Sequence, residues 1–336
     1  MRGQNAVTMK EVAERAGVSM MTVSLALRGD VSGSRISEET RRRVLEAARA
    51  LRYRPNARGR ALRSGCTNII GLYAGYGVVN VRLPFFTEIV SGLQEGCEQF
   101  QKDLLLYGIF HGYTPEDIFT ELADGRIDGL VVKMPPEDPV AERLADSHLP
   151  VVAIADPLPG IPAVVVDDAA GSRLLARHLI GRGYRRFVYV SCRVNVIPAM
   201  RRREAFLQTA AEAGLEVGET EEILSSTPGA YDGFLQSLLA RERQPPTAIV
   251  CWNDQIALQV FADCRRQRIR VPEQIAVAGF DGCPTPYEDV WSLTTVRAPW
   301  AAAARTAVQH LRDLLEGKSL AQETVLPVEL IPGHTA

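Results

Sequence analysis

The stretch TMKEVAERAGVSMMTVSLALRG (residues 8–29) predicts two short helices on either side of a glycine. Thr8 and Glu11 have the spacing of a capping box, which marks the start of the first helix. Gly17 is placed to end that helix, and Ser19 is suited to cap the second. The apolar side chains with the spacing to pack the two helices together are Val12, Ala13, Ala16, Val23, Ala26 and Leu27. The chain therefore opens with a helix-turn-helix pattern.

A third helix is expected after Ser37, because Glu38 and Glu39 favour the first turn of a helix. Its predicted inward side chains are Val44, Leu45, Ala48 and Leu51. We expect residues 1–54 to form a separate three-helix unit.

One face of the second helix carries none of the residues expected to pack in the core. A helix-turn-helix presents such a face to the DNA major groove. At 100° per residue this face carries Met21, Ser24, Leu25 and Arg28, with Met20 at its border. Arginines that are suited to neutralise phosphates surround it: Arg41, Arg42, Arg43, Arg52, Arg54 and Arg58. The alternative is a solvated basic domain that packs on the rest of the chain.

Charge is distributed unevenly along the 336 residues, although the net charge is only −2. Residues 1–66 carry 14 Lys and Arg against 6 Asp and Glu, whereas the remainder carries 24 against 34. A basic head on an acidic body indicates that one end of the chain meets a polyanion.

Residues 55–67 are expected to be a hinge. Asn56 is suited to cap a helix that ends before Gly65, but so short a helix is not stable alone. The alternative is a plain arginine-rich linker.

Beyond residue 67 the sequence predicts an α/β body over residues 68–336. Eight β-branched runs alternate with helical stretches, namely NIIGLY, DLLLYGI, DGLVVKM, PVVAIAD, AVVVDD, RRFVYVS, TAIVCWND and QIAVAGFD. This alternation is typical of doubly wound parallel sheets. A break in composition near 157–164 favours two lobes, with the chain crossing between them near 157–165 and 290–298. Ligands bind such folds at the carboxyl ends of the strands, so we expect a binding cleft between the lobes.

The opening stretch, followed by YRPN at 53–56, resembles the amino-terminal signature of the lactose/galactose repressor (LacI/GalR) family of bacterial transcription regulators. The later stretches WNDQIALQVF, IRVPEQIAVAGFDG and LTTV resemble the same family, so the likeness covers nearly the whole chain. It implies a helix-turn-helix headpiece on a two-lobed body like that of periplasmic binding proteins.

The resemblance implies that Met20, Met21 and Leu25 read base edges, and that Leu62 of a paired hinge helix wedges into the minor groove. All three base-reading positions are apolar, which favours contact with thymine methyl groups and readout of DNA shape. The full set expected at DNA is Thr8, Ser19, Met20, Met21, Thr22, Ser24, Leu25, Arg28, Tyr53, Asn56, Arg58 and Leu62.

The resemblance also implies an effector site in the cleft, made of Phe85, Phe86, Asp156, Arg202 and Asp254. An aromatic face covers the apolar side of a sugar or base. A carboxylate accepts hydrogen bonds from hydroxyl groups, and an arginine donates hydrogen bonds to the ligand. Each residue has a structural alternative: the Phe pair as core, Asp254 as a helix cap, and Arg202 as a surface arginine.

These observations predict a DNA-binding regulator, a repressor, that acts as a homodimer on a pseudo-palindromic operator and responds to a small effector, expected to be a carbohydrate. A nucleobase or nucleoside effector is the alternative, and a solute-binding protein is the rival class. The sequence lacks G-x-G-x-x-G after the first strand, a P-loop and a G-x-S-x-G elbow, so no enzyme activity is expected. The six cysteines have no C-x-x-C spacing, and no apolar run reaches the length of a membrane span, so we expect no metal, no cofactor, no membrane and a cytoplasmic location.

Overall fold

Three helices make up the described part of the amino-terminal unit in this computed structural model. The structure describes residues 7–27, 36–54, 59, 61, 65–75, 79–194, 196–223, 228–240, 247–284 and 292–336. These residues divide into two units, Met1–Thr67 and Asn68–Ala336, and each unit is described here by itself.

Helix α1 (Met9–Ala16) has the start and end that the sequence predicts, and α2 (Met20–Leu27) has the predicted start. Thr8 and Glu11 form a capping box, and Gly17 ends α1 with φ at 65°, a conformation that favours glycine. The backbone N–H of Thr22 donates to the Ser19 hydroxyl (3.2 Å), which caps α2.

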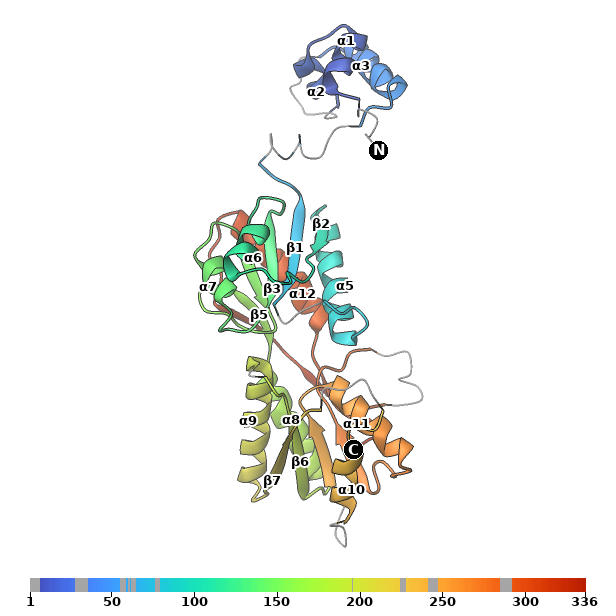
Figure 1. Cartoon of the computed structure of the whole chain (residues 1–336), viewed down its shortest axis with the longest axis vertical. Helices are drawn as coiled ribbons and strands as arrows, with labels where there is room; N and C mark the ends of the chain where they lie inside the picture. Colours follow the sequence, from blue (N-terminus) through green and yellow to red (C-terminus); the bar gives the residue numbers. More distant parts are fainter. Residues whose placement is uncertain are drawn as a thin grey trace. The chain divides into compact units, whose positions relative to one another are not determined.

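Helix α3 (Glu38–Ala50) starts at Ser37, whose hydroxyl accepts from the backbone N–H of Thr40. Val12, Val23 and Val44, one from each helix, are fully buried in the common core. The three-helix unit predicted from the sequence is therefore present (Figure 1).

The body contains a six-stranded parallel sheet whose neighbours follow the order β11-β5-β4-β3-β1-β2. Its strands are β1 (Ile69–Ala74), β2 (Asp103–Leu106), β3 (Gly129–Lys133), β4 (Val151–Ile154), β5 (Ala163–Val166) and β11 (Glu323–Leu326). The first five follow the doubly wound 2-1-3-4-5 order.

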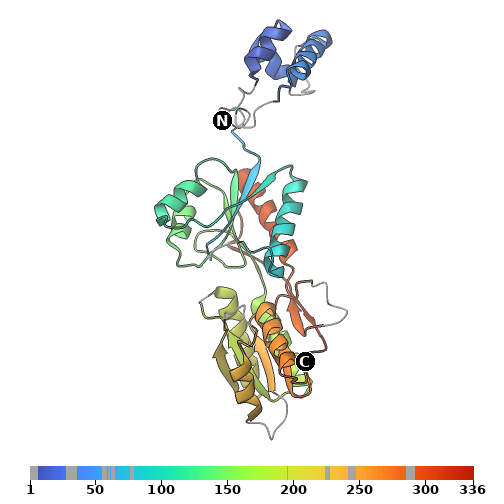
Figure 2. The ribbon, with the colours of Figure 1, turned by 45° about the vertical axis from the view of Figure 1, so that its right-hand side comes forward.

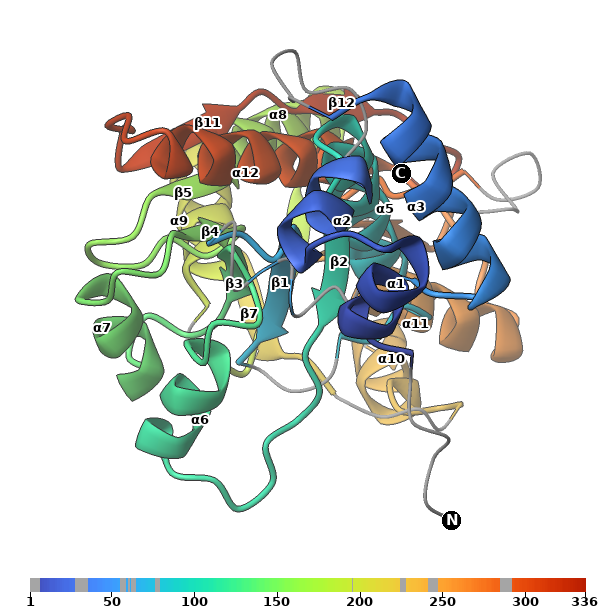
Figure 3. The ribbon, with the colours of Figure 1, turned by 90° about the horizontal axis from the view of Figure 1, so that it is seen from above.

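Helices cover both faces of this sheet (Figures 1 and 2). On one face α5 (Pro84–Gln99) packs along α12 (Trp300–Leu315), as Figures 2 and 3 show from two directions. The helices approach so closely that a Cβ added at Gly92 would overlap the carbonyl oxygen of Ala301. The other face carries α6 (Pro115–Leu122) and α7 (Pro139–Ala145).

A second parallel sheet has the order β7-β6-β8-β9, which repeats the winding of the first. Its strands are β6 (Arg186–Ser191), β7 (Val217–Glu221), β8 (Thr247–Cys251) and β9 (Ile275–Ala278). Its helices are α8 (Asp168–Gly181), α9 (Ile197–Glu212), α10 (Asp232–Ala240) and α11 (Asp254–Arg266).

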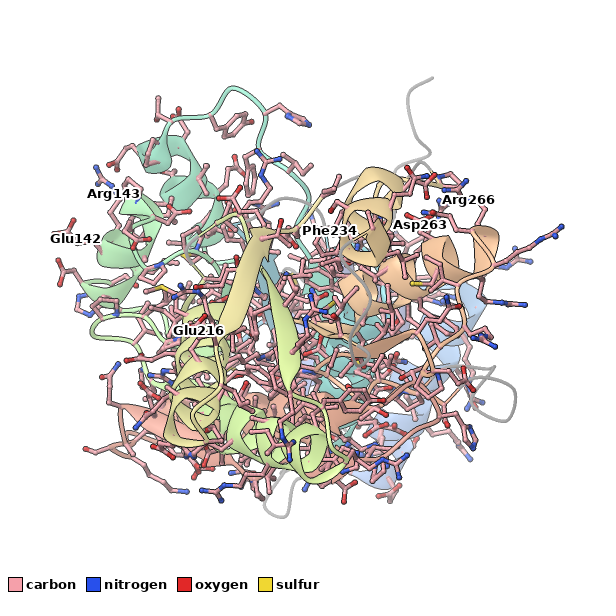
Figure 4. The ribbon with its side chains drawn as sticks, turned by 90° about the horizontal axis from the view of Figure 1, so that it is seen from below. Glu142, Arg143, Glu216, Phe234, Asp263 and Arg266 are labelled. Atoms are coloured by element: carbon pink, nitrogen blue, oxygen red, sulfur yellow. The ribbon has the colours of Figure 1, made fainter. Side chains whose placement is uncertain are left out.

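Helices α10 and α11 are tied together by Asp263, which accepts from the backbone N–H groups of Gly229 (2.7 Å) and Tyr231 (3.0 Å). Figure 4 shows Asp263 and Arg266 of α11 beside Phe234 of α10. This lobe is thus also stabilised by buried hydrogen bonds that lie away from the cleft.

The chain crosses between the lobes after β5, just beyond the region near 157–165 that was expected, because β5 still pairs with β4 in the first sheet. It returns through β10 (Thr295–Arg297), which lies inside the range 290–298 expected for the second crossing, and crosses again between β11 and β12 (Glu329–Ile331). Strands β10 and β12 pair antiparallel. The final crossing was not predicted.

Each of the eight predicted runs contains a strand, and the predicted fold class is confirmed. Strands β7, β10, β11 and β12 were not among the predicted runs. Among the described residues, no helix is long and apolar enough to cross a membrane.

Candidate DNA-binding face and effector cleft

Helix α2 presents an apolar face that the core of its own unit leaves uncovered. Met20 is 55% exposed and Met21 is 75% exposed, whereas Val23 and Ala26 of the same helix are buried. Ser24 and Leu25 are half-buried at the edge of this face. An exposed methionine pair on a short helix fits contact with thymine methyl groups.

Among the other residues expected at DNA, some cap helices, one packs on the core and four are not described by the structure. Thr8 and Ser19 are the helix caps described above, and the hydroxyl of Thr22 lies 3.0 Å from that of Ser19. Tyr53 packs partly against the helical core. Four further expected residues, Arg28, Asn56, Arg58 and Leu62, lie outside the described residues.

A cavity of about 780 Å³ lies between the two lobes of the body. Its polar lining comes largely from the carboxyl ends of parallel strands, the position where ligands bind such folds. All five residues expected at the effector site line it: Phe85, Phe86, Asp156, Arg202 and Asp254.

Arg202 is buried and fully engaged with the second lobe, so the surface alternative is wrong. Its Nε donates to Asp168 Oδ1 (2.7 Å), and its Nη1 donates to the Trp252 carbonyl oxygen (2.9 Å) and to Asp281 Oδ1 (3.2 Å). The guanidinium also lies 3.8 Å from the centre of the Phe280 ring. Burial raises the pKa of Asp168 to about 6, although Arg202 opposes the rise.

Asp254 is held by the chain itself. Its Oδ1 accepts from the Thr295 hydroxyl (2.6 Å) and its Oδ2 from the backbone N–H of Gly282 (2.7 Å). Burial, followed by repulsion from Asp281, raises the pKa of Asp254 to about 7. The cap of α11 is Asn253, not Asp254. Asp254 therefore lines the cavity while joining the start of α11 to the loop after β9 and to β10.

Asp281 adds a second carboxylate to the same wall of the cavity as Asp254. Its Oδ1 accepts from Arg202 and from Trp300 Nε1 (3.3 Å), while none of the described residues donates to its Oδ2. Burial raises the pKa of Asp281, against the opposing charges of Arg202 and Lys133.

Asp156 stands on the opposite wall, after β4, and is completely buried. Its Oδ2 accepts from Lys133 Nζ (2.6 Å), which comes from the end of β3. Its Oδ1 is buried and has no hydrogen-bond partner among the described residues. Lys133 Nζ also lies 5.8 Å from the centre of the Phe85 ring.

The aromatic pair of α5 faces the cavity rather than the core alone. The Phe85 ring meets Phe86 and Trp300 edge to face, with centroids 5.2 and 5.0 Å apart. Both phenylalanines are half-buried, so they offer apolar surface that a ring-shaped ligand would cover.

Four charged residues of the cavity were not predicted from the sequence: Lys133, Glu222, Asp281 and Arg297. Lys133 and Asp281 come at or just after predicted strands, in VVKM and AGFD, so their position at a strand end was a usable signal. Glu222 follows the unpredicted strand β7, and nothing in the sequence marked it.

Comparisons with known proteins agree across the chain. Residues 8–56 match the family described as bacterial regulatory proteins, lacI family, and residues 176–336 match the periplasmic binding protein-like domain. The transcriptional regulator GalS of Salmonella typhimurium is 30% identical over 309 residues, covering 90% of this chain and 88% of GalS. The transcriptional repressor PurR of Mannheimia succiniciproducens is 28% identical and covers 95% of each chain.

A solved structure has the same arrangement of elements. The lac repressor dimer bound to operator and the anti-inducer ONPF is 25% identical, with a TM-score of 0.81 and coverage of 98% of this chain and 99% of that chain.

Proposed function

Because this chain belongs to the lacI family of bacterial regulatory proteins, we propose that it represses transcription by binding a pseudo-palindromic operator as a homodimer. The observation that carries the proposal is the uncovered methionine face of α2 on a separately cored helical unit. One such unit reads only a half-site, so a two-fold symmetric pair is needed to read a palindrome. Its place of action is the cytoplasm, where bacterial DNA lies.

The proposed DNA-contacting residues are Met20, Met21 and Leu25 at base edges, with Thr22, Ser24 and the flanking arginines at the backbone. Apolar side chains at the base-reading positions favour sites rich in thymine. A selection from a randomised duplex pool tests this: we expect enrichment of two inverted half-sites. Enrichment of no sequence, or of single unpaired half-sites, would contradict the proposal.

The proposed effector site is the cavity between the lobes, where Phe85 and Phe86 would cover a ring and Asp281 and Asp156 would accept hydrogen bonds from its hydroxyl groups. We favour a carbohydrate over a nucleobase because the unengaged polar atoms are carboxylate oxygens, which suit hydroxyl donors. By linkage, effector and operator change each other's affinity by the same factor.

A thermal-shift panel of monosaccharides, nucleobases and nucleosides tests the effector class. A ligand at 100 times its dissociation constant stabilises the folded state by about 2.7 kcal/mol. Stabilisation by a nucleobase and not by any carbohydrate would favour the alternative effector.

A further inference from the structure

The cavity between the lobes is lined by more carboxyl groups than cationic groups. Four carboxylates line it, from Asp156, Glu222, Asp254 and Asp281, and Asp168 lies directly behind Arg202. The cations that line it are Lys133, Arg202 and Arg297. Arg297 is already paired, because its Nη1 lies 3.3 Å from a carboxylate oxygen of Glu329 on β12 and its Nε donates to the Gly282 carbonyl oxygen (3.4 Å).

The two remaining cations are already committed. Lys133 pairs with Asp156 (2.6 Å), and Arg202 is shared between Asp168 (2.7 Å) and Asp281 (3.2 Å). Two carboxylates therefore compete for the single guanidinium of Arg202. The charge that Arg202 supplies covers only one of them.

Glu222 is buried with hydrogen bonds from neutral groups only. Its Oε2 accepts from Trp252 Nε1 (2.7 Å), and its Oε1 accepts from the backbone N–H of Arg193 (3.1 Å) and from the Cys192 thiol (3.3 Å). None of the salt bridges among the described residues reaches it. Asp254 likewise accepts only from Thr295 and Gly282.

Two carboxylate oxygens at this cavity accept no hydrogen bond from any described residue. Oδ1 of Asp156 is completely buried and unpartnered among the described residues, which is costly for a carboxylate unless a ligand supplies the bond. Oδ2 of Asp281 receives no bond from any described group. The two walls face the same space, because the charge of Lys133, bonded to Asp156, also acts on Asp281.

The crowding affects how readily these groups ionise. Burial raises the pKa of Asp168 to about 6 and that of Asp254 to about 7, and repulsion from Asp281 adds to both shifts. A cation placed among these carboxylates would favour their ionised forms, whereas a neutral ligand would leave the repulsion in place.

We propose that the effector carries a protonated amine on a polyhydroxy frame, as an amino sugar does, with the ammonium group among the cavity carboxylates. The inference rests on the proposed effector site and names the chemical class of its ligand. An ammonium group has three donors and no acceptor, which matches unpaired carboxylate oxygens. Phe85 and the Trp300 ring that it contacts give the cation and the sugar ring an aromatic wall.

The test compares matched ligands on the full-length protein by isothermal titration calorimetry. The probes are D-glucosamine, D-glucose, N-acetyl-D-glucosamine and D-glucuronate, with the same set built on galactose and mannose. We expect at least one amine to bind tenfold or more tightly than its hydroxyl counterpart and its acetylated form, since acetylation removes the charge.

Charge-removing variants of similar size locate the effect. D281N, D156N and E222Q should each reduce the preference for amine over hydroxyl at least threefold, and the three variants together guard against one that fails to fold. E95Q is the control, because it removes an exposed carboxylate whose partner, Arg305, does not line the cavity. It should leave the preference unchanged.

A neutral sugar or a sugar acid that binds as tightly as its amine would overturn the inference while leaving the carbohydrate effector intact. Binding by none of the amines would also overturn it. Selection of an operator is independent of both results, so failure of the amine does not count as failure of the DNA-binding function.

Discussion

The helical unit and the α/β body differ in how far their proposed functional side chains are exposed. On α2, Met20 and Met21 are exposed and make no contribution to the core of their unit. In the cleft, Arg202 and Asp168 are almost completely buried and bonded to each other. The proposed DNA face is thus free to change without loss of fold, whereas the proposed effector site contains side chains that hold its lobe together.

The largest expected effect comes from removing the buried cation. Arg202→Ala leaves Asp168 and Asp281 without their partner, so we expect the free energy of unfolding of the body to fall by about 3–5 kcal/mol. Urea denaturation followed by tryptophan fluorescence measures it. Arg203→Ala, the next residue of α9 with an exposed ion pair to Glu219, is the control and should change it by at most about 1 kcal/mol. Equal effects would contradict the contrast.

The next effect is a pH dependence that belongs to the cleft. The pKa of Asp254 is about 7 in the folded protein against an ordinary 3.8, so between about pH 4 and pH 7 the folded state keeps a proton that the unfolded chain has lost. The free energy of unfolding therefore falls as the pH rises through this window.

Asp254→Asn should make that fall shallower, because the amide keeps both hydrogen bonds and does not titrate: its oxygen accepts from Gly282 and its nitrogen donates to the Thr295 hydroxyl. Asp168, with its pKa raised to about 6, keeps part of the slope. Denaturation curves from pH 4.5 to 7.5 measure how the free energy of unfolding depends on pH. The same dependence in Asp254→Asn as in the parent protein would contradict the raised pKa of Asp254.

A smaller effect is expected at the first cap of the helical unit. Thr8→Ala removes the side-chain acceptor of the α1 capping box and should destabilise this unit by about 1 kcal/mol. Amide hydrogen exchange of residues 9–16 in the full-length protein should speed up about fivefold. Thr8→Ser keeps the hydroxyl and should exchange like the parent chain, whereas equal acceleration in both variants would assign the effect to the methyl group.

A still smaller effect concerns the two lobes. Arg201 of α9 makes two hydrogen bonds to Glu323 of β11 (3.0 and 2.9 Å), which joins the lobes beside the cleft residue Arg202. Both side chains are about one third exposed, so a double-mutant cycle should give a coupling energy of about 0.5 kcal/mol. The cycle uses Arg201→Ala, Glu323→Ala and the double variant. No measurable coupling would mean that this pair does not join the lobes in solution.

The smallest effect on stability is expected on the DNA face. Met21→Ala should change the free energy of unfolding by less than about 0.5 kcal/mol, because the side chain is 75% exposed. Chemical denaturation measures it. A loss of 2 kcal/mol would show that this face is covered by another part of the protein.

The sequence predicted elements that local rules define. Capping by Thr8 and Ser37, the turn at Gly17 and the buried strands all follow from spacing and composition over a few residues. Strand β7 was missed because VGETE is polar and lies at a sheet edge, where one-sided exposure removes the apolar signal. The pairing of β5 with β4, which decides the lobe to which β5 belongs, is not encoded locally.

The cleft was predicted in part for the same reason. Five lining residues were predicted through a family likeness, but the different contacts of Asp254 and Asp281 were not. Asp254 contacts Thr295 and Asp281 contacts Arg202, which lie 41 and 79 residues away from them in the chain. Such pairings arise only once both sheets have formed.

Fluorescence anisotropy of a labelled operator duplex, titrated with the protein at rising salt, tests the central claim that the helical unit binds DNA through an uncovered face and basic surroundings. We predict that affinity for the selected operator falls about 10³-fold between 50 and 200 mM salt, as expected for about six phosphate contacts. Met21→Ala should keep this salt dependence while losing preference for the operator over random duplex. Affinity that does not change with salt, or an unaltered preference in the variant, would contradict the account.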